Sequence, residues 1–433
     1  MDATTLTLGQ IKSRRVLYLV FATVTLLVLG LIYAWSIFAA PIGRYFTDLG
    51  GPFVDYIPLL PQVFQVSMFA FCLSALVGAQ IVKKFSARAA IIVAAILMAV
   101  GFVLTALLAG VDIWVLFLFY GIIAGSGCGI AYNAIISLVN PWFPDRIGLC
   151  SGIMMMGFGI SSLVFGSLAN AMFGIMDWQM VFFLIAAVAF VIMLALAFVV
   201  RPAPKDIAAT LGIERAAVAA KTSPTQQQFI LKTKTFWFYS VWSVIIVACG
   251  LAIIGTAAQG AARLELDTTI FAGFGALLVG LVSTMNGLSR IINGAIFDKM
   301  GLLPVMVLSA VLAIACMLGL SASLAVALGP LYIVAAILVA LPYGSVPVMA
   351  SAFSRQRFGA QNFAMNLGIT NCCIAAAATV NLIINAIFGS PAGENGPIIY
   401  GILAALAVVA FLIIFVFNRS YKSDLAAIAK ELD

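Results

Sequence analysis

The sequence predicts an all-α membrane protein whose twelve transmembrane helices form two halves of six. Hydrophobic residues make up 64% of the 433 positions and charged residues only 9%, whereas about a quarter of the residues in a soluble domain are charged. The apolar residues gather in stretches of about 20, the length that an α-helix needs to cross a hydrocarbon core of about 30 Å. The alternating pattern of a membrane β-barrel is absent, which favours helices.

Twelve apolar windows define the expected helices, and the longest polar stretch divides them. Residues 201–235 carry Pro202, Pro204, Pro224 and three consecutive glutamines, which predicts a cytoplasmic linker. The linker separates an N-terminal half at 1–200 from a C-terminal half at 236–418, and residues 419–433 form a cytoplasmic tail. The expected helices span residues 16–41, 57–82, 88–110, 113–139, 148–173, 178–200, 236–260, 270–296, 303–325, 330–353, 361–388 and 397–418.

Basic residues predict the orientation, because loops rich in Lys and Arg stay in the cytoplasm. With both termini in the cytoplasm, only Arg44 and Arg263 lie outside. The opposite topology would place nearly every basic residue on the wrong face, so the charge pattern and the even number of helices support each other. The basic residues expected in the cytoplasm are Lys12, Arg14, Arg15, Lys83, Lys84, Arg88, Arg146, Arg201, Lys205, Arg215, Lys221, Lys232, Lys234, Lys299, Arg355, Arg357, Arg419, Lys422 and Lys430.

An internal repeat links the two halves. The loop after the eighth helix runs from Gly294 through Asp298 to Gly301 in the pattern G-x-x-x-D-x-x-G, and residues 79–88 occupy the same place in the first half. A second correspondence joins the loop at 142–148, which contains Asp145 and Arg146, to the loop at 354–359. We expect Asp145 and Arg146 to form interdomain or helix-end ion pairs that hold one conformational state, and the glycine-rich repeat loop to take part in the same gating.

Arg290 is the only charged residue expected in the interior of a predicted span, since the spans contain no Asp or Glu and the chain contains no His. A buried charge is expensive and needs a partner. One interpretation is an arginine that reaches the membrane interface. We favour a binding site whose counter-charge is a mobile anion, because Asp298 lies about 12 Å further along the helix. The planar guanidinium donates two parallel hydrogen bonds, which suits a carboxylate.

Other polar and aromatic residues are expected near the middle of the membrane. Asn286 lies one turn before Arg290 on the same helix face and could orient the guanidinium, donate to the ligand or simply pack. Each of the others could equally face lipid or the core, but together they could line a cavity for a small acid. They are Tyr33, Trp35, Tyr132, Asn133, Phe158, Tyr343, Asn366, Thr370 and Asn371.

Five segments spread over the chain carry a resemblance to a known family. They are Tyr33–Ser36 with Ala40 and Pro41, Tyr132 with Asn140–Arg146, Gly148–Gly152, Phe236 with Trp237, and Asn286–Gly301. Together they resemble the bacterial oxalate:formate antiporter family, which is close to the monocarboxylate transporters of the major facilitator superfamily. The resemblance covers essentially the whole chain and implies the major facilitator fold, a bacterial inner membrane and a monomer.

The same resemblance assigns roles to individual residues. In the antiporter family a dicarboxylate lies between one basic residue on helix 8 and one on helix 11, inside an aromatic cage. Arg290 matches the first basic residue, but the second position falls on Thr370 and a caging tryptophan falls on Leu367. Asn286 stands where monocarboxylate transporters often carry an aspartate implicated in proton coupling. The cage positions fall on Tyr33, Tyr132, Phe158 and Tyr343.

The resulting expectation is a secondary transporter that carries small organic anions by alternating access. Because one cation pairs with one carboxylate, we expect a short monocarboxylate such as lactate, pyruvate or formate, bound by Arg290 with the cage residues, Asn286, Asn366 and Thr370. A proton could be carried with the acid, or a second anion exchanged for it. The alternatives are an oxalate:formate type of antiporter and a non-transporting membrane sensor. We expect no enzyme activity, metal, cofactor or nucleic-acid partner, because a catalytic or metal-binding cluster is absent from the sequence.

Overall fold

The structure of the protein, a computed structural model, describes residues 7–107, 112–204, 207–212, 223–254, 256–270 and 274–432. The side chains at positions 36, 58, 61, 170, 267, 276 and 432 are not described. Three basic residues that the sequence places in the cytoplasm, Lys205, Arg215 and Lys221, lie outside the described residues. Every regular element within the described ranges is helical.

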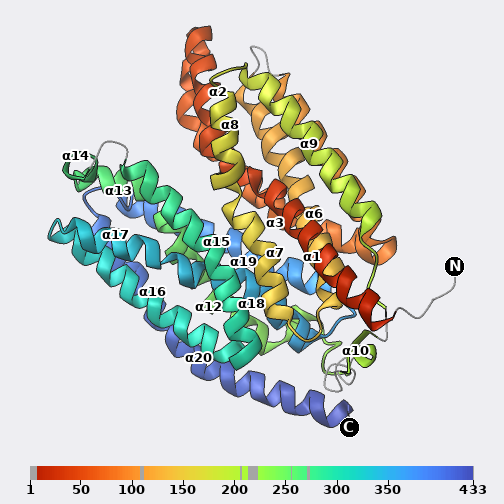
Figure 1. Ribbon diagram of the computed structural model, residues 1–433. Coiled ribbons are helices and arrows are strands. Elements are labelled where there is room, and N and C mark those ends of the chain that lie inside the picture. Colours follow the sequence, from red (N-terminus) through yellow and green to blue (C-terminus); the bar gives the residue numbers. More distant parts are fainter. Residues whose placement is uncertain are drawn as a thin grey trace. The chain divides into compact units, whose positions relative to one another are not determined.

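Contacts along the chain divide it into two compact units. The first comprises residues 1–145 and 153–217, and the second comprises residues 146–152 and 218–433. In Figure 1 the helices of the first unit run from red to yellow-green and those of the second from green to blue. The helix α7 begins in the second unit and continues in the first, because the division between the units at residue 152 falls within it.

The first unit is built from α3 packed on α6, and from α4 packed on α9 and α6. Segments of 3₁₀ or π helix, labelled η, interrupt several of its helices. Its elements, together with the whole of α7, are α1 (Leu8–Leu29), η1 (Gly30–Ala34), α2 (Trp35–Leu49), η2 (Gly51–Leu59), α3 (Leu60–Lys84), α4 (Ala87–Ala106), α5 (Ile113–Leu116), η3 (Phe117–Ala124), α6 (Gly125–Val139), η4 (Asn140–Trp142), α7 (Ile147–Ser161), η5 (Ser162–Gly166), α8 (Ser167–Met172), α9 (Trp178–Val199) and α10 (Ile207–Thr210).

The second unit packs α16 against α20, α15 against α18, and α12 against both α19 and α20. Figure 1 shows α16 and α20 side by side along most of their length. Its elements are η6 (Ile230–Lys232), α12 (Lys234–Ile254), α13 (Ala257–Arg263), α14 (Leu266–Thr269), α15 (Phe274–Met300), α16 (Leu302–Ala325), α17 (Gly329–Leu338), α18 (Ala340–Phe358), α19 (Phe363–Phe388) and α20 (Gly396–Leu432).

The helices have the length and composition of membrane spans. Among the described residues, 11 helical stretches are long and apolar enough to cross a bilayer, and α15 is a further helix of 27 residues. The predicted all-α membrane fold is therefore confirmed. The helix α20 continues without a break through the predicted tail, since it ends only at Leu432.

The first helix is longer than the predicted range of 16–41, because local capping extends it at both ends. Thr7 accepts from the backbone N–H of Gln10 while Gln10 accepts from that of Thr7, which forms a capping box. The helix then runs through η1 and α2 to Gly50, whose φ of +65° suits glycine. At Gly30 an added Cβ would lie 2.5 Å from Ser161 Cβ, so glycine allows η1 to approach η5 and α7 closely.

Arg357 near the end of α18 is 1% exposed and organises the adjoining end of the second unit. Its Nε lies 2.5 Å from Asp424 Oδ2 on α20, and its Nη1 donates to the carbonyl of Thr225 at 2.9 Å. Thr225 in turn donates through its backbone N–H to Glu431 at 2.9 Å. The ion pair of Arg357 with Asp424 joins α18 to α20. The two hydrogen bonds of Thr225 hold this part of the predicted linker against both helices.

Candidate functional site

Three of the predicted cage residues come together in the first unit. The ring of Phe158 on α7 lies 5.1 Å from that of Tyr33 on η1 and 5.2 Å from that of Tyr132 on α6, measured between centroids. The first of these pairs is edge-to-face, at an interplanar angle of 89°, which aromatic quadrupoles favour. Phe158 is 2% exposed, so the cluster lies within the packed part of the unit.

Two further rings belong to this cluster and were not singled out from the sequence. Phe71 on α3 lies 5.3 Å from Tyr132 and 5.9 Å from Phe158, and Phe64 lies 5.7 Å from Tyr33. A phenylalanine in an apolar helix carries no distinguishing signal, because it looks like any lipid-facing or core residue. We define the aromatic cluster as these five residues: Tyr33, Phe64, Phe71, Tyr132 and Phe158.

Arg290 and Asn286 lie one turn apart on α15 in the second unit, as their spacing requires. Arg290 is 3% exposed and Asn286 is 7% exposed. The side-chain oxygen of Asn286 is buried and accepts no hydrogen bond from any described residue. A buried acceptor of this kind can receive a hydrogen bond from a ligand hydroxyl or from a protonated acid.

Helix α18 approaches α15 beside Asn286. An added Cβ on Gly344 would lie 2.9 Å from the carbonyl oxygen of Asn286, so the glycine permits this contact. The neighbouring Tyr343 is 3% exposed, and its ring packs on Gly250 of α12, where an added Cβ would lie 2.5 Å from Tyr343 Cγ. Tyr343 thus lies in the second unit on α18, the helix that packs against the Arg290 helix α15.

Asn366 and Thr370 lie one turn apart on α19, and both are buried. The Thr370 hydroxyl donates to the carbonyl of Asn366 at 2.7 Å and shares a hydrogen bond of 3.1 Å with Ser354 on α18. These bonds explain how a hydroxyl is tolerated at this position. Thr370 therefore joins α19 to α18, and it carries no charge that could bind a second carboxylate.

The predicted gating residues lie in the last two turns of α15, directly after it, and in the turn before α7. Both carboxylate oxygens of Asp298 on α15 accept hydrogen bonds at the start of α7, one from the N–H of Gly148 at 2.8 Å and one from that of Leu149 at 2.7 Å. A carboxylate at a helix N-terminus satisfies free N–H groups and meets the positive end of the helix dipole. Gly294 contacts the backbone of Gly148, where there is no room for a Cβ. Gly301 ends α15 with a φ of +84°.

Asp145 forms an ion pair with Arg15 inside the first unit. The Arg15 guanidinium also lies over the ring of Phe143, 4.5 Å from its centroid. This arrangement fixes the start of the first helix to the loop after α6. Arg146 is exposed and lies in the segment that groups with the second unit.

Three curated relatives of the chain are named as transporters. An uncharacterized MFS-type transporter of Escherichia coli K12, YhjX, is 24% identical over 370 residues, which cover 84% of this chain and 86% of that protein. The oxalate:formate antiporter of Oxalobacter formigenes is 25% identical over 285 residues, or 66% of this chain and 63% of that protein. Monocarboxylate transporter 9 of Rattus norvegicus is 33% identical over 87 residues, which are 20% of this chain and 17% of that protein. The predicted resemblance to these families is confirmed.

Solved structures show the same fold. The proton:xylose symporter XylE bound to 6-bromo-6-deoxy-D-glucose superimposes with a TM-score of 0.67 at 15% identity and covers 95% of this chain and 96% of its own. FucP in the outward conformation gives a TM-score of 0.60 at 16% identity, covering 93% and 99%. A profile described as the Major Facilitator Superfamily matches residues 33–380. The chain is therefore a multi-pass membrane protein that belongs to the Major Facilitator Superfamily.

Proposed function

We propose that the protein is a secondary transporter of small organic anions, and that a short monocarboxylate of the lactate, pyruvate or formate type pairs with Arg290. The observation that carries this proposal is a 3% exposed arginine on a helix of 27 residues. A charge at this depth is expensive unless an anion neutralises it. A carboxylate fits the guanidinium fork and can leave again, which a fixed acidic residue could not do.

The second unit supports a single carboxylate per binding event. Thr370 occupies the position where the resemblance places a second cation, and its hydroxyl is already used in hydrogen bonds with Asn366 and Ser354. The acceptor oxygen of Asn286 suits an acid that carries a hydroxyl group, as lactate does. The aromatic cluster of the first unit is proposed as a further substrate-binding surface, because ring surfaces suit the apolar part of a small acid.

The remaining features of the proposal concern how the anion crosses. Alternating access moves the predicted half at 1–200 against that at 236–418, in a bacterial inner membrane with both termini in the cytoplasm. The hydrogen bonds from the start of α7 to Asp298 stabilise one conformational state. The Arg15 and Asp145 ion pair contributes to the same state. The transporter acts as a monomer, with a proton or an exchanged anion as the coupled species.

An oxalate:formate type of exchange is the second candidate, because the antiporter of Oxalobacter formigenes is 25% identical over 285 residues. Oxalate carries two carboxylates on adjacent carbons, so its binding to one arginine would leave a buried negative charge unneutralised. The two candidates differ in a measurable way. The oxalate:formate candidate takes up oxalate in exchange for formate inside the vesicles, whereas the monocarboxylate candidate takes up lactate, pyruvate or formate in preference to oxalate.

The test is uptake of radiolabelled acids into proteoliposomes that contain the purified protein. Lactate, pyruvate, formate and oxalate are compared in the wild type, in Arg290→Gln and in Arg419→Gln, which removes an exposed arginine from α20. Removal of one partner from a desolvated charge pair costs about 2–5 kcal/mol, so we expect uptake to fall at least about 30-fold in Arg290→Gln. Arg419→Gln should retain wild-type uptake. Undiminished monocarboxylate uptake in Arg290→Gln would contradict the assignment of the site.

A further inference from the structure

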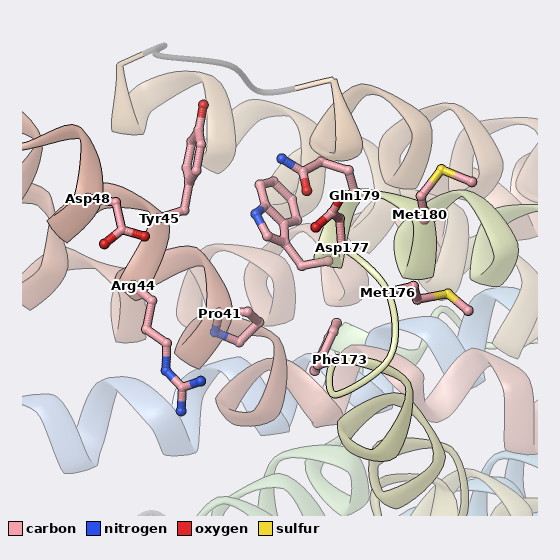
Figure 2. A pocket seen from close by; sticks show the side chains of 10 residues that line it. Pro41, Arg44, Tyr45, Asp48, Phe173, Met176, Asp177, Gln179 and Met180 are labelled. Carbon is pink, nitrogen blue, oxygen red and sulfur yellow. The ribbon is translucent and has the colours of Figure 1, made fainter.

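A cavity of about 610 Å³ lies in the first unit, between the end of α2 and the start of α9. Figure 2 shows Arg44 and Asp48 extending in different directions from α2, with Asp177 and Gln179 across the cavity from them. The cavity shares no residue with the aromatic cluster. It is therefore separate from the site proposed for the transported anion.

The cavity presents opposite charges that do not neutralise each other. Arg44, Asp48 and Asp177 form no ion pair or hydrogen bond through their side chains with any described residue. Trp178 also lines the cavity, and its ring is 8% exposed. The indole of a tryptophan presents an apolar body and one N–H donor. The cavity thus offers a cation and an indole N–H donor for an anionic group, and two carboxylates for a cationic group.

The position of the cavity corresponds to a membrane boundary. Helix α9 has 22 residues and is about 33 Å long, close to the thickness of a hydrocarbon core, so its first residue Trp178 lies near one surface. Tyr45 packs against Trp178 with centroids 5.7 Å apart, and such amphipathic rings collect at headgroup depth. Met176 and Met180 line the cavity and are exposed, at 37% and 56%. Exposed apolar side chains beside a polar cavity suit a ligand with both a polar and an apolar part.

We propose that this cavity binds the headgroup of a zwitterionic phospholipid with a primary ammonium, the phosphatidylethanolamine class. Arg44 and the Trp178 indole N–H hold the phosphate, Asp48 and Asp177 hold the ammonium, and the acyl chains leave along Met176 and Met180. Two acidic groups against one arginine exclude a purely anionic headgroup, since it would meet net negative charge. The lipid sits at the end of the first unit opposite to Arg201, which follows the other end of α9.

The test measures lipid retained by the purified full chain. The protein is delipidated, incubated in micelles with equal amounts of phosphatidylethanolamine and phosphatidylglycerol, and examined by native mass spectrometry. We expect preferential retention of phosphatidylethanolamine by about tenfold, a difference of about 1.4 kcal/mol. Arg44→Gln and Asp177→Asn should each abolish the preference. The matched controls Lys84→Gln and Asp55→Asn change exposed charges of the same unit outside the cavity and should preserve it.

Two outcomes would overturn the proposal. One is equal retention of the two lipids by the wild type, or a preference that survives in the Arg44→Gln, Asp177→Asn double variant. The other is displacement of bound lipid by water-soluble glycerophosphoethanolamine at an equal concentration, which would show that a soluble zwitterion is the ligand. Phosphatidylcholine, whose methylated ammonium donates no N–H hydrogen bonds, should be retained less than phosphatidylethanolamine. Because Arg44 and Asp177 are exposed, their substitution leaves the packed helices intact.

Discussion

The two units differ in the chemistry of the residues assigned to the site. In the first unit these residues belong to a cluster of five aromatic rings around Phe158, in which the centroids of neighbouring rings lie 5.1 to 5.9 Å apart. In the second unit the assigned residues are mainly polar and lie on three helices, with Arg290 and Asn286 on α15, Tyr343 on α18, and Asn366 and Thr370 on α19. The residues assigned in the first unit therefore present ring surfaces, and those assigned in the second unit present a charge and hydrogen-bonding groups.

This difference indicates which residues can alter the substrate of a transporter with this fold. Ring surfaces recognise the size and apolar character of a ligand but discriminate weakly, because one methylene group contributes about 1–3 kcal/mol. Charge discriminates strongly, because an unpaired buried charge is expensive. We expect changes in the second unit to decide the number of carboxylates that are accepted, and changes in the first unit to alter affinity. Two substitutions test this division.

The largest expected effect is a change of substrate class in Thr370→Lys. Thr370 is 1% exposed on the same unit as Arg290, so a lysine there needs an anionic partner. Oxalate can supply it with a second carboxylate, and a monocarboxylate cannot. We expect the ratio of oxalate uptake to lactate uptake in proteoliposomes to rise by about 100-fold, as the neutralisation of a buried charge contributes about 2–5 kcal/mol.

Thr370→Met is the matched control for this substitution, because methionine has a similar length and no charge. It also removes the hydroxyl that bonds Asn366 and Ser354, so it reports the structural part of the change. Both variants are first compared with the wild type by size-exclusion profile. An equal rise of the uptake ratio in Thr370→Met would show that the added charge is not the cause. It would contradict the expectation that residues of the second unit decide the number of carboxylates that are accepted.

A smaller effect is expected from Phe158→Leu in the first unit. Its ring contacts Tyr33, Tyr132 and Phe71, and each aromatic pair contributes about 0.5–1.5 kcal/mol beyond burial. We expect the KM for the transported monocarboxylate to rise by about tenfold, with no change in the ratio of oxalate to lactate uptake. The measurement is the concentration dependence of initial uptake rates.

The matched control is Phe102→Leu. Phe102 is 1% exposed and belongs to a second group of rings in the same unit, with Phe38, Tyr120 and Phe182. Its replacement should lower the melting temperature as much as Phe158→Leu does and leave the KM near the wild-type value. A similar rise of KM in both variants would mean that Phe158 acts through stability rather than through contact with the substrate.

The sequence predicted the membrane fold and the position of Arg290 because both depend on hydropathy, which is a local property. The structure also brings Tyr33, Tyr132 and Phe158 together, and only the resemblance to a family had indicated that they would be neighbours. The contacts of Phe71 and Phe64 could not be predicted, since they depend on how α3 packs. The extension of the first helix to Leu8 had a visible signal in the Thr7 and Gln10 capping box.

The role of Arg357 shows the limit of reasoning from charge patterns. The sequence placed it among the cytoplasmic basic residues, where a solvated side chain is the usual expectation. The structure buries it to 1% exposure with Asp424 and Thr225, which lie 67 and 132 residues away along the chain. Partners at such distances follow from tertiary packing, so no local pattern could have identified them.

The two units also differ at the loops that the internal repeat relates. Asp298 in the second unit accepts two hydrogen bonds from the start of α7, whereas Lys83 stands at the corresponding place of the first unit. A lysine cannot accept hydrogen bonds and would be repelled by a helix N-terminus. We expect the loop of the second unit to stabilise one conformation, and the loop of the first unit to have no such function.

The smallest expected effect is therefore that of Asp298→Asn, which removes the charge but keeps one acceptor oxygen. The loss of one charged hydrogen bond at a helix N-terminus costs about 1 kcal/mol, which corresponds to an approximately fivefold shift in a two-state equilibrium. Cys150 on α7 is 1% exposed and one residue beyond the capped N–H groups, so its alkylation by a maleimide reports the opening of this end of the helix. Peptide mapping distinguishes it from the six other cysteines. Alkylation should become about fivefold faster in Asp298→Asn and stay unchanged in Lys83→Gln. Equal acceleration of Cys150 alkylation in the two variants would contradict the expected difference, because it would mean that both loops stabilise the same conformation.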